Sequence, residues 1–352
     1  MTAEIEMKGI ESDSGGKKGG LNFFEKYLYI WIAICIAIGI LLSQTVPYIS
    51  QAIDSLQIGG VSIPIGICLF LMMYPAVLNL KTSEIKKLKN KPLPIILTLI
   101  SNWAVAPVIG AILARIFLTD TQLIIAVILL ASSPCTAMVL VWGYLAEGNQ
   151  EQNVITTSIN TITIIIGYAG MVTLLTGIQG IYINWVALLV SAGVFIGLPI
   201  IVGYITKKII IQRKGEGWFL DVYKPIIGKV AIVALLTTLI VLFSLNGNTM
   251  INNPMQLVLV SIPLLLGFVI VVGYNLIVTR VAKLKYKEAV ITVIIGSSSH
   301  FEIAIATAVT LYGVGSLAAL GTTMGLFWEI PIMLGLVYLG KYLRKKNFWE
   351  SD

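Results

Sequence analysis

Two carboxylates and three thiols lie inside long apolar stretches of this 352-residue chain, where ionisable side chains are rare. Glu302 and Glu329 each lie within such a stretch, and Cys135 lies in another. A charge at the centre of a membrane helix costs roughly 2.5–3.5 kcal/mol on insertion scales, so intramembrane carboxylates usually carry protons, ions or substrate. A cysteine sulfur suits soft, thiophilic solutes. For both glutamates a second role is open, as a hydrogen-bonded side chain that fixes helix packing.

Small polar residues interrupt two of the apolar stretches at mid-length. A lipid-exposed backbone cannot leave its amides unsatisfied, so interrupted membrane helices persist only where protein surrounds them or where they line a cavity, as in transporters. We therefore expect the two breaks to mark a binding site. The first break is Ser132, Ser133, Pro134 and Cys135, and the second is Gly296, Ser297, Ser298, Ser299 and His300.

The composition excludes a soluble globular enzyme. Hydrophobic residues make up 57% of the chain and charged residues only 12%, with a mean hydropathy of +0.92. The net charge of +7 does not indicate a nucleic-acid partner, because the basic residues lie in short loops that flank apolar runs. The three cysteines are far apart and show no C-x-x-C spacing, so we expect no structural metal, disulfide framework or cofactor.

Apolar segments of about 20 residues span a bilayer, and the sequence predicts ten of them. An N-terminal segment, 1–26, is too polar for a signal peptide and is expected to be a disordered cytoplasmic tail, while 341–352 is expected to be a second cytoplasmic tail. The expected spans are 27–46, 61–80, 92–118, 121–146, 153–176, 184–211, 225–245, 256–279, 288–312 and 314–340.

The basic residues predict the orientation of these spans. All 24 of them except Arg115 fall in the segments that would be cytoplasmic if both termini lie inside. We therefore expect a multi-pass protein of the inner or plasma membrane, in contact with the lipid bilayer and with both ends in the cytoplasm. The sequence leaves the oligomeric state open, including a homo-oligomer.

Ten spans divide into two repeats of five, over 27–176 and 177–340, which must enter the membrane in opposite directions. The breaks fall in the fourth and ninth spans, so we expect an all-helical fold of two inverted repeats whose discontinuous helices cross at the midplane. Half-helix ends at such a crossing can bind ions or polar solutes.

Four further polar or aromatic residues lie close to the breaks in this arrangement. His300, the single histidine, could share a proton with Glu302 or act as a neutral hydrogen-bond donor. Asn102 and Asn160 would line the cavity, or would join helices by hydrogen bonds worth about 1 kcal/mol. Trp142 would line it too, or would anchor the chain at the membrane interface.

Several of these segments resemble the arsenite efflux permeases of the bile acid/arsenite/riboflavin transporter superfamily. The resemblance implies ten spans with crossed fourth and ninth helices, and export of arsenite, sometimes antimonite, in exchange for protons. It implies that Cys135 and Glu302 are the essential pair and that Asn102, Trp142, Asn160 and Glu329 support them. The matching segments are Ser101-Asn102-Trp103, Cys135 to Trp142, Asn160, Phe301-Glu302-Ile303-Ala304-Ile305-Ala306 and Glu329-Ile330-Pro331.

The chain departs from that pattern at two places. Pro134 stands where an arginine commonly precedes the cysteine, and Ser299 and His300 replace the usual asparagines before Phe-Glu. A serine-proline break is closer to the sodium-coupled bile-acid branch, so a sodium-coupled symporter of organic anions is the alternative function. In the arsenite mechanism, neutral arsenite would meet Cys135 and the hydroxyls of Ser132, Ser133, Ser298 and Ser299, while Glu302 would exchange the proton.

Overall fold

The computed structural model describes residues 28–46, 48, 56–58, 61–78, 92–136, 138–313 and 315–350. The expected N-terminal tail, 1–26, and the basic loop between the second and third expected spans, 81–91, lie outside the described residues. The described chain is almost entirely helical, as expected from its composition, apart from one antiparallel pair of two-residue strands, β1 (Gln57–Ile58) and β2 (Val61–Ser62).

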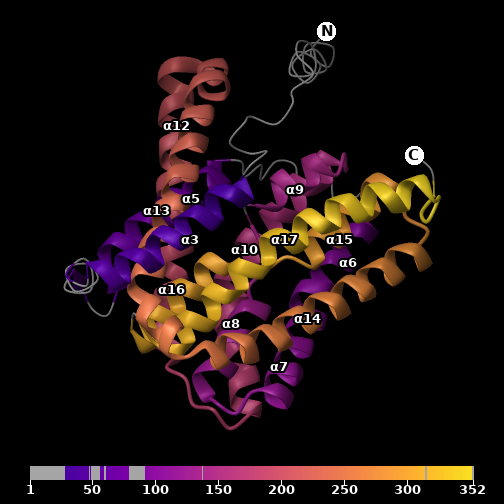
Figure 1. The fold of residues 1–352 in the computed structure, drawn as a ribbon. Helices are drawn as coiled ribbons and strands as arrows, with labels where there is room; N and C mark the ends of the chain where they lie inside the picture. The colour runs from indigo at the N-terminus through magenta and orange to yellow at the C-terminus, as the bar shows by residue number, and fades with distance from the viewer. Residues whose placement is uncertain are drawn as a thin grey trace.

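The helices follow the expected apolar segments (Figure 1). Their bounds are α3 Leu28–Thr45, α5 Ile63–Leu78, α6 Pro92–Ile100, α7 Ala106–Phe117, α8 Thr121–Ala131, α9 Val139–Leu145 and α10 Gln150–Ile178 in the first part of the chain. They are α11 Trp185–Ala192, α12 Leu198–Trp218, α13 Lys224–Asn252, α14 Pro254–Val281, α15 Tyr286–Gly296, α16 Phe301–Tyr312 and α17 Leu317–Lys345 in the second. Three short π-helical segments join neighbours: η2 Ser101–Val105, η3 Gly193–Gly197 and η4 Phe219–Tyr223.

Five helices within the described residues are long and apolar enough to cross a membrane, judged by length and composition. These are Pro92–Phe117, Gln150–Ile178, Leu188–Asn248, Pro254–Val281 and Leu317–Lys345. The full set of ten spans stays a prediction. The 61-residue helix Leu188–Asn248 covers two expected spans, and its one non-helical position is Gly215, where φ is +83° and ψ is 162°. Glycine adopts this backbone conformation without the steric cost that a side chain would add.

The helices form two groups. α13 packs chiefly against α3 and α5, and α12 packs against α5. The other group holds α7 beside α14, α8 between α7 and α17, and α16 against α17. Figure 1 shows α12 projecting away from this second group, whereas α14 and α7 lie side by side on the opposite side of the molecule.

Both interrupted helices lie in the interior of the second group. Every residue of α8 from Leu123 to Leu130 is buried, and so is every residue of α15 from Ala289 to Gly296. A helix that is apolar on all sides is normally surrounded by protein. Asp120 caps the start of α8, where its side chain accepts hydrogen bonds from the amides of Gln122 and Leu123. The two breaks are therefore held within protein and are not exposed to lipid.

The expected C-terminal tail, 341–352, is ordered over most of its length. α17 continues through Lys345, and the buried indole of Trp349 donates a hydrogen bond to Thr279 Oγ1 at 3.1 Å. Glu147, in the turn between α9 and α10, forms ion pairs with Lys341 at 3.1 Å and with Arg344 at 3.0 Å. The end of α17 is thus fixed to the turn that follows the first interrupted helix.

Candidate functional site

The two breaks contact each other through their backbones. Pro134 and Ser299 form an isolated antiparallel bridge, and the amide of His300 donates to the carbonyl of Ser133 at 2.6 Å. Each interruption frees backbone groups that a continuous helix would pair internally, and a buried group of this kind needs a partner. Some of the freed backbone groups of each break are therefore paired with backbone groups of the other break. This contact between segments about 165 residues apart along the chain was expected from the two polar interruptions.

The first break is held in place by α10. Asn160 donates a hydrogen bond from Nδ2 to the carbonyl of Cys135 at 3.2 Å, and both residues are buried. Within the break, the hydroxyl of Ser133 donates to the carbonyl of Leu130 at 2.8 Å. Pro134 has no amide hydrogen and disfavours helical geometry at Ser133. The proline thus opens the helix, and Asn160 pairs with a carbonyl beside the opening, which places it next to Cys135.

The second break is held in place by α17. The carboxylate of Glu329, which is 2% exposed, accepts three hydrogen bonds from the break. Ser298 Oγ donates to Oε1 at 2.5 Å, the Ser299 amide donates to Oε1 at 3.2 Å, and Ser299 Oγ donates to Oε2 at 3.1 Å. Glu329 therefore fixes the backbone and side chains of both serines.

Asn275 is a third residue that fixes the breaks, and the sequence analysis did not single it out. Its Nδ2 donates to Ser101 Oγ at 2.9 Å and to Ser297 Oγ at 3.0 Å. Ser101 in turn donates to the carbonyl of Gly296 at 2.8 Å. A methyl group on Gly296 would lie 2.8 Å from Asn275 Oδ1, closer than real side chains approach. Asn275 is fully buried in an apolar helix, and that polarity was the one available signal.

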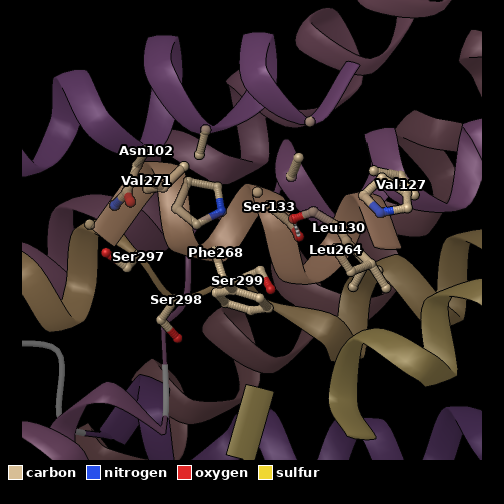
Figure 2. A pocket seen from close by; sticks show the side chains of 17 residues that line it. Asn102, Val127, Leu130, Ser133, Leu264, Phe268, Val271, Ser297, Ser298 and Ser299 are labelled. Carbon is tan, nitrogen blue, oxygen red and sulfur yellow. Dashed lines mark hydrogen bonds between the residues drawn. The ribbon is translucent and has the colours of Figure 1, made fainter. Parts of the chain in front are cut away.

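A pocket lies against both breaks, between α7, α8 and α14 (Figure 2). It encloses about 550 Å³, counting the space at its open mouth. Its polar end consists of Asn102 and the serines Ser133, Ser297, Ser298 and Ser299. The rest of the lining is mainly apolar and includes Val127, Leu130, Leu264, Phe268 and Val271.

Asn102 is the side chain of this pocket with an unused donor. It is 3% exposed, and its Nδ2 has no hydrogen-bond partner among the described residues. An unpaired buried amide costs free energy, typically about 1–3 kcal/mol, and a bound ligand can remove that cost. Asn102 lies in the π-helical segment η2, and π-bulges within α-helices are frequent at functional sites.

The other expected site residues lie outside the pocket lining. Ser132 is buried at the end of α8, and Cys135 is 2% exposed. Trp142 packs within the hydrophobic core. Thus the pocket includes four of the expected residues, Asn102, Ser133, Ser298 and Ser299. The remaining ones are Ser132, Cys135, Trp142, Asn160, His300, Glu302 and Glu329.

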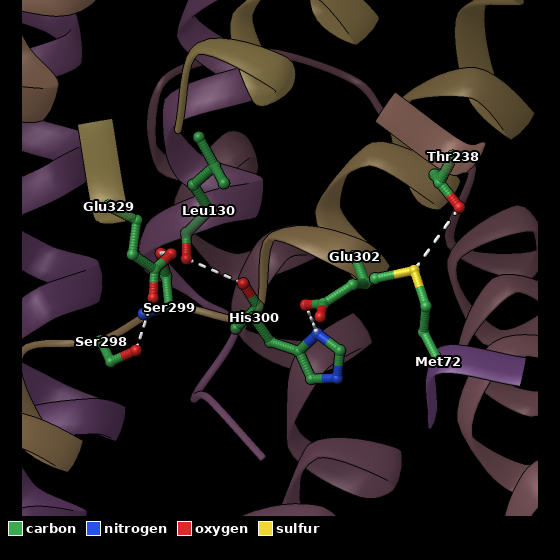
Figure 3. A network of polar contacts seen from close by, with 9 residues as sticks. Met72, Leu130, Thr238, Ser298, Ser299, His300, Glu302 and Glu329 are labelled. Atoms are coloured by element: carbon green, nitrogen blue, oxygen red, sulfur yellow. Dashed lines mark hydrogen bonds and ion pairs between the residues drawn. The ribbon is translucent and has the colours of Figure 1, made fainter. Parts of the chain in front are cut away.

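His300 and Glu302 form a buried pair at the start of α16 (Figure 3). His300 Nδ1 lies 2.8 Å from Glu302 Oε2, and their side chains are 1% and 6% exposed. This contact has the distance of an ion pair, and Nδ1 has no hydrogen-bond partner among the described residues. The second ring nitrogen, Nε2, has no partner among the described residues. His300 thus lies beside the carboxylate, as the first of its two possible roles requires.

Comparison with known proteins identifies relatives along nearly the whole chain. The model of the Sodium Bile acid symporter family matches residues 66–253. An uncharacterized transporter of Synechocystis sp. is 39% identical over 95% of this chain and 92% of its own length. The arsenical-resistance protein Acr3 of Alkaliphilus metalliredigens is 32% identical, over 92% of this chain and 94% of its own. Acr3 of Corynebacterium glutamicum is 29% identical, over 94% and 92% respectively.

Proposed function

Because the chain belongs to the Sodium Bile acid symporter family, a family of membrane transporters, we propose that it exports arsenite from the cytoplasm in exchange for protons. Two relatives that match over more than nine-tenths of this chain are named arsenical-resistance proteins. The segments that resemble arsenite permeases adjoin both breaks, and they include Asn160 and Glu329, which bind the first and the second break respectively. Antimonite, which has the same trihydroxide form, is a second candidate substrate.

The observation that carries this proposal is the pocket whose polar end is formed by both breaks. Ser133 comes from the first break, and Ser298 and Ser299 come from the second. A solute at this end would touch both interrupted helices at once. In secondary transporters, discontinuous helices form the binding site around which one part of the protein moves against another. A bound solute would therefore affect the relative position of the two breaks.

The chemistry of the polar end suits a small neutral hydroxylated solute. Arsenite at cytoplasmic pH is As(OH)3, whose hydroxyls both donate and accept hydrogen bonds. Asn102 offers an unpaired donor, and the serine hydroxyls offer both donors and acceptors. Pro134 brings no positive charge to the first break, so an oxyanion would gain no ion pair there. These features favour the trihydroxide over a charged form.

Cys135 would bind the arsenic atom in a different conformation of the first break. Its neighbour Pro134 lines the pocket, but Cys135 itself is buried outside the lining. A modest rotation of the backbone at the break would turn the thiol towards the solute. A single sulfur contact can be released again, whereas a carrier that held arsenic by three thiolates would trap it, because transport requires reversible binding.

Glu302 would carry the exchanged proton, and Glu329 would stabilise the second break. Glu302 has His300 as its close partner, whereas Glu329 is engaged by three donors from Ser298 and Ser299. A proton that reaches Glu302 from outside would favour the state that releases arsenite. Glu329 could also share the proton-coupling role. Glu329→Gln tests this separately, because glutamine can keep the hydrogen bonds to Ser298 and Ser299 but cannot carry a proton.

We further propose that the chain forms ten spans arranged as two inverted repeats, with both ends in the cytoplasm. The structure offers one parallel between the halves in support. α10 follows the first interrupted helix and binds that break through Asn160, while α17 follows the second and binds its break through Glu329. The ion pairs of Glu147 with Lys341 and Arg344 place two basic residues beside the turn between α9 and α10. Basic residues are enriched on the cytoplasmic side of membrane proteins, so this end of the molecule would face the cytoplasm.

A sodium-coupled symporter of organic anions remains the second candidate, and the apolar pocket wall favours it. Leu264, Phe268 and Val271 on α14 could cover the body of an amphipathic acid, and Asn102 could donate to its carboxylate. In this case Glu302 would be a sodium ligand. This function predicts sodium dependence and no need for Cys135.

Flux in inside-out membrane vesicles separates the two functions. We expect vesicles with an acidic interior to accumulate arsenite without sodium, and an organic anion not to be taken up under a sodium gradient. Cys135→Ser should abolish accumulation, while Cys35→Ser, a matched loss of a buried thiol on α3, should leave it intact. Uptake that depends on sodium, or full arsenite accumulation by Cys135→Ser, would contradict the proposal.

A further inference from the structure

The pocket at the two breaks is larger than arsenite needs, and most of its lining is apolar. In Figure 2, Asn102, Ser297 and Ser298 lie at one side of the pocket, whereas Leu130 and Leu264 lie at the other. As(OH)3 fills roughly the space of three water molecules, about 90 Å³ at about 30 Å³ each. The pocket encloses about 550 Å³, counting its mouth. Arsenite therefore leaves the apolar part of the pocket without a matching ligand group.

The serine hydroxyls at the polar end have already donated their hydrogens to the protein. Ser133 donates to the carbonyl of Leu130, and Ser298 and Ser299 donate to the carboxylate of Glu329. A hydroxyl that donates its hydrogen can still accept through its lone pairs. These three serines therefore present acceptors to the pocket, and a ligand must supply hydrogens in order to bind them.

Asn102 adds a donor at the same end. Its Nδ2 has no partner among the described residues. Three acceptors and one unpaired donor are complementary to a neutral ligand with two hydroxyl groups, whose hydrogens go to serines and whose oxygen accepts from Asn102. A carboxylate brings no hydrogen, so it would satisfy Asn102 but would leave the serine lone pairs facing its own oxygens.

The apolar wall of the pocket comes from two helices. Leu264, Phe268 and Val271 follow one another at four and three residues on α14, and Val127 and Leu130 are three residues apart on α8, so each set occupies one face of its helix. Phe268 is half-buried and the other four are buried. Their side chains carry no polar atom. A ligand hydroxyl directed at this wall would lose its hydrogen bonds to water without replacement, which costs free energy.

Trivalent arsenic is pyramidal, so its three substituents diverge and cannot all reach one end of the pocket. When two hydroxyls of As(OH)3 contact the serines, the third is directed at the apolar wall. We propose that the pocket also takes arsonous acids, R–As(OH)2, in which an apolar alkyl or aryl group R replaces this third hydroxyl, and that the protein exports them. The inference rests on the proposed export of arsenite and extends the substrates to organic arsenicals.

A homologous pair of compounds tests the apolar part of the pocket. Methylarsonous and ethylarsonous acid are added as competitors of arsenite accumulation in inside-out vesicles with an acidic interior. We expect both to compete, and the Ki of the ethyl compound to be about fourfold lower, the effect of burying one methylene. Arsenic supplied as methylarsonous acid alone should accumulate above the level in vesicles without the protein. Equal Ki values, or no such accumulation, would overturn the proposal.

Variants of the wall separate binding in the pocket from partition into the bilayer, which also favours the ethyl compound. Leu264→Ser removes part of the apolar wall, and Phe268→Ser does so at a half-buried position, where folding is less at risk. Both should raise the Ki of the ethyl compound towards that of the methyl compound. Leu266→Ser is the matched control, since Leu266 lies on the same helix, is 38% exposed and does not line the pocket. It should keep the fourfold difference. A difference that persists in both wall variants would refute the proposed place of R.

Propanoate tests the hydrogen-bonding argument, because it joins the same ethyl group to a carboxylate. We expect no competition with arsenite at concentrations where ethylarsonous acid competes fully. Equal competition by the two compounds would show that ligand hydroxyls are not required and would contradict the proposal.

The outcomes separate this inference from the proposed function. If the unsubstituted protein does not accumulate arsenite, the proposed function fails. Equilibrium dialysis of the two arsonous acids against the purified protein then decides whether the pocket binds them, by the ethyl preference and its loss in Leu264→Ser and Phe268→Ser. If arsenite accumulates but neither arsonous acid competes, the inference is refuted while the proposed function stands.

Discussion

Substitutions of Glu329 distinguish two possible roles of this residue: it could hold the second break in place, or it could carry the exchanged proton. Alanine would leave Ser298 Oγ, the Ser299 amide and Ser299 Oγ without their acceptors. Side-chain hydrogen bonds between membrane helices average about 0.6 kcal/mol and reach about 1.7 kcal/mol. Loss of three should therefore lower the free energy of unfolding by about 2–5 kcal/mol.

Glutamine is the matched substitution, because it has the same shape and can replace all three hydrogen bonds. Its Oε1 can accept from Ser298 and from the Ser299 amide, while its Nε2 can donate to the hydroxyl of Ser299, which also accepts. We expect the free energy of unfolding of Glu329→Gln to lie within about 1 kcal/mol of that of the unsubstituted protein. It should also retain arsenite flux driven by a pH gradient, if Glu302 alone carries the proton.

Unfolding in mixed micelles of detergent and SDS, followed by tryptophan fluorescence, measures the free energies, and vesicle flux measures the coupling. An alanine variant as stable as the unsubstituted protein would refute the structural role of Glu329. A glutamine variant that is stable but has lost pH-driven flux would show that Glu329 takes part in proton exchange. The two measurements thus test the two roles independently.

Three further predictions concern other parts of the molecule. Gly296→Ala would place a methyl group 2.8 Å from Asn275 Oδ1, so the same unfolding assay should show a loss of about 1–3 kcal/mol. Asn102→Ala removes a donor without a protein partner, so stability should change little while the KM for arsenite rises roughly tenfold, the effect of about 1.4 kcal/mol. At the surface, the hydrogen bond and charge of Lys341 lower the pKa of Glu147 below the usual 4.5. Ionised Glu147 therefore stabilises the folded protein above the usual pKa of 4.5, and this stabilisation is lost as the pH falls through the lowered pKa of the folded state. Glu147→Gln should cost at most about 1 kcal/mol near neutral pH, and the difference should vanish in acid.

The breaks and their mutual contact were predictable because each consists of small polar residues within an apolar run. Serine and proline disrupt a helix locally, through competing hydrogen bonds and a missing amide, so the sequence shows where they act. For His300 the sequence left two roles open, a proton shared with Glu302 or a neutral hydrogen-bond donor, and the structure places its Nδ1 2.8 Å from Glu302 Oε2. Asn160 was expected either to line the cavity or to join helices by hydrogen bonds; it does not line the pocket, and it joins α10 to the first break through the carbonyl of Cys135.

The distribution of the site residues around the breaks was not predictable. Ser133 and Pro134 line the pocket but Cys135 does not. The sequence does not reveal which side faces the cavity. Asn275 was missed for a related reason. One asparagine in an apolar helix signals a polar partner, but the rotation of the helix decides which residue that partner is.

The pocket has its polar end on the breaks and much of its apolar wall on α14, and this division has a practical use in protein engineering. Leu264, Phe268 and Val271 can be exchanged without altering a residue of the two breaks. A combinatorial library confined to these positions would vary the size and shape of the accepted solute while leaving the coupling machinery in place. Selection for growth on toxic hydroxylated metalloids or organic acids could then yield carriers of new specificity from one scaffold.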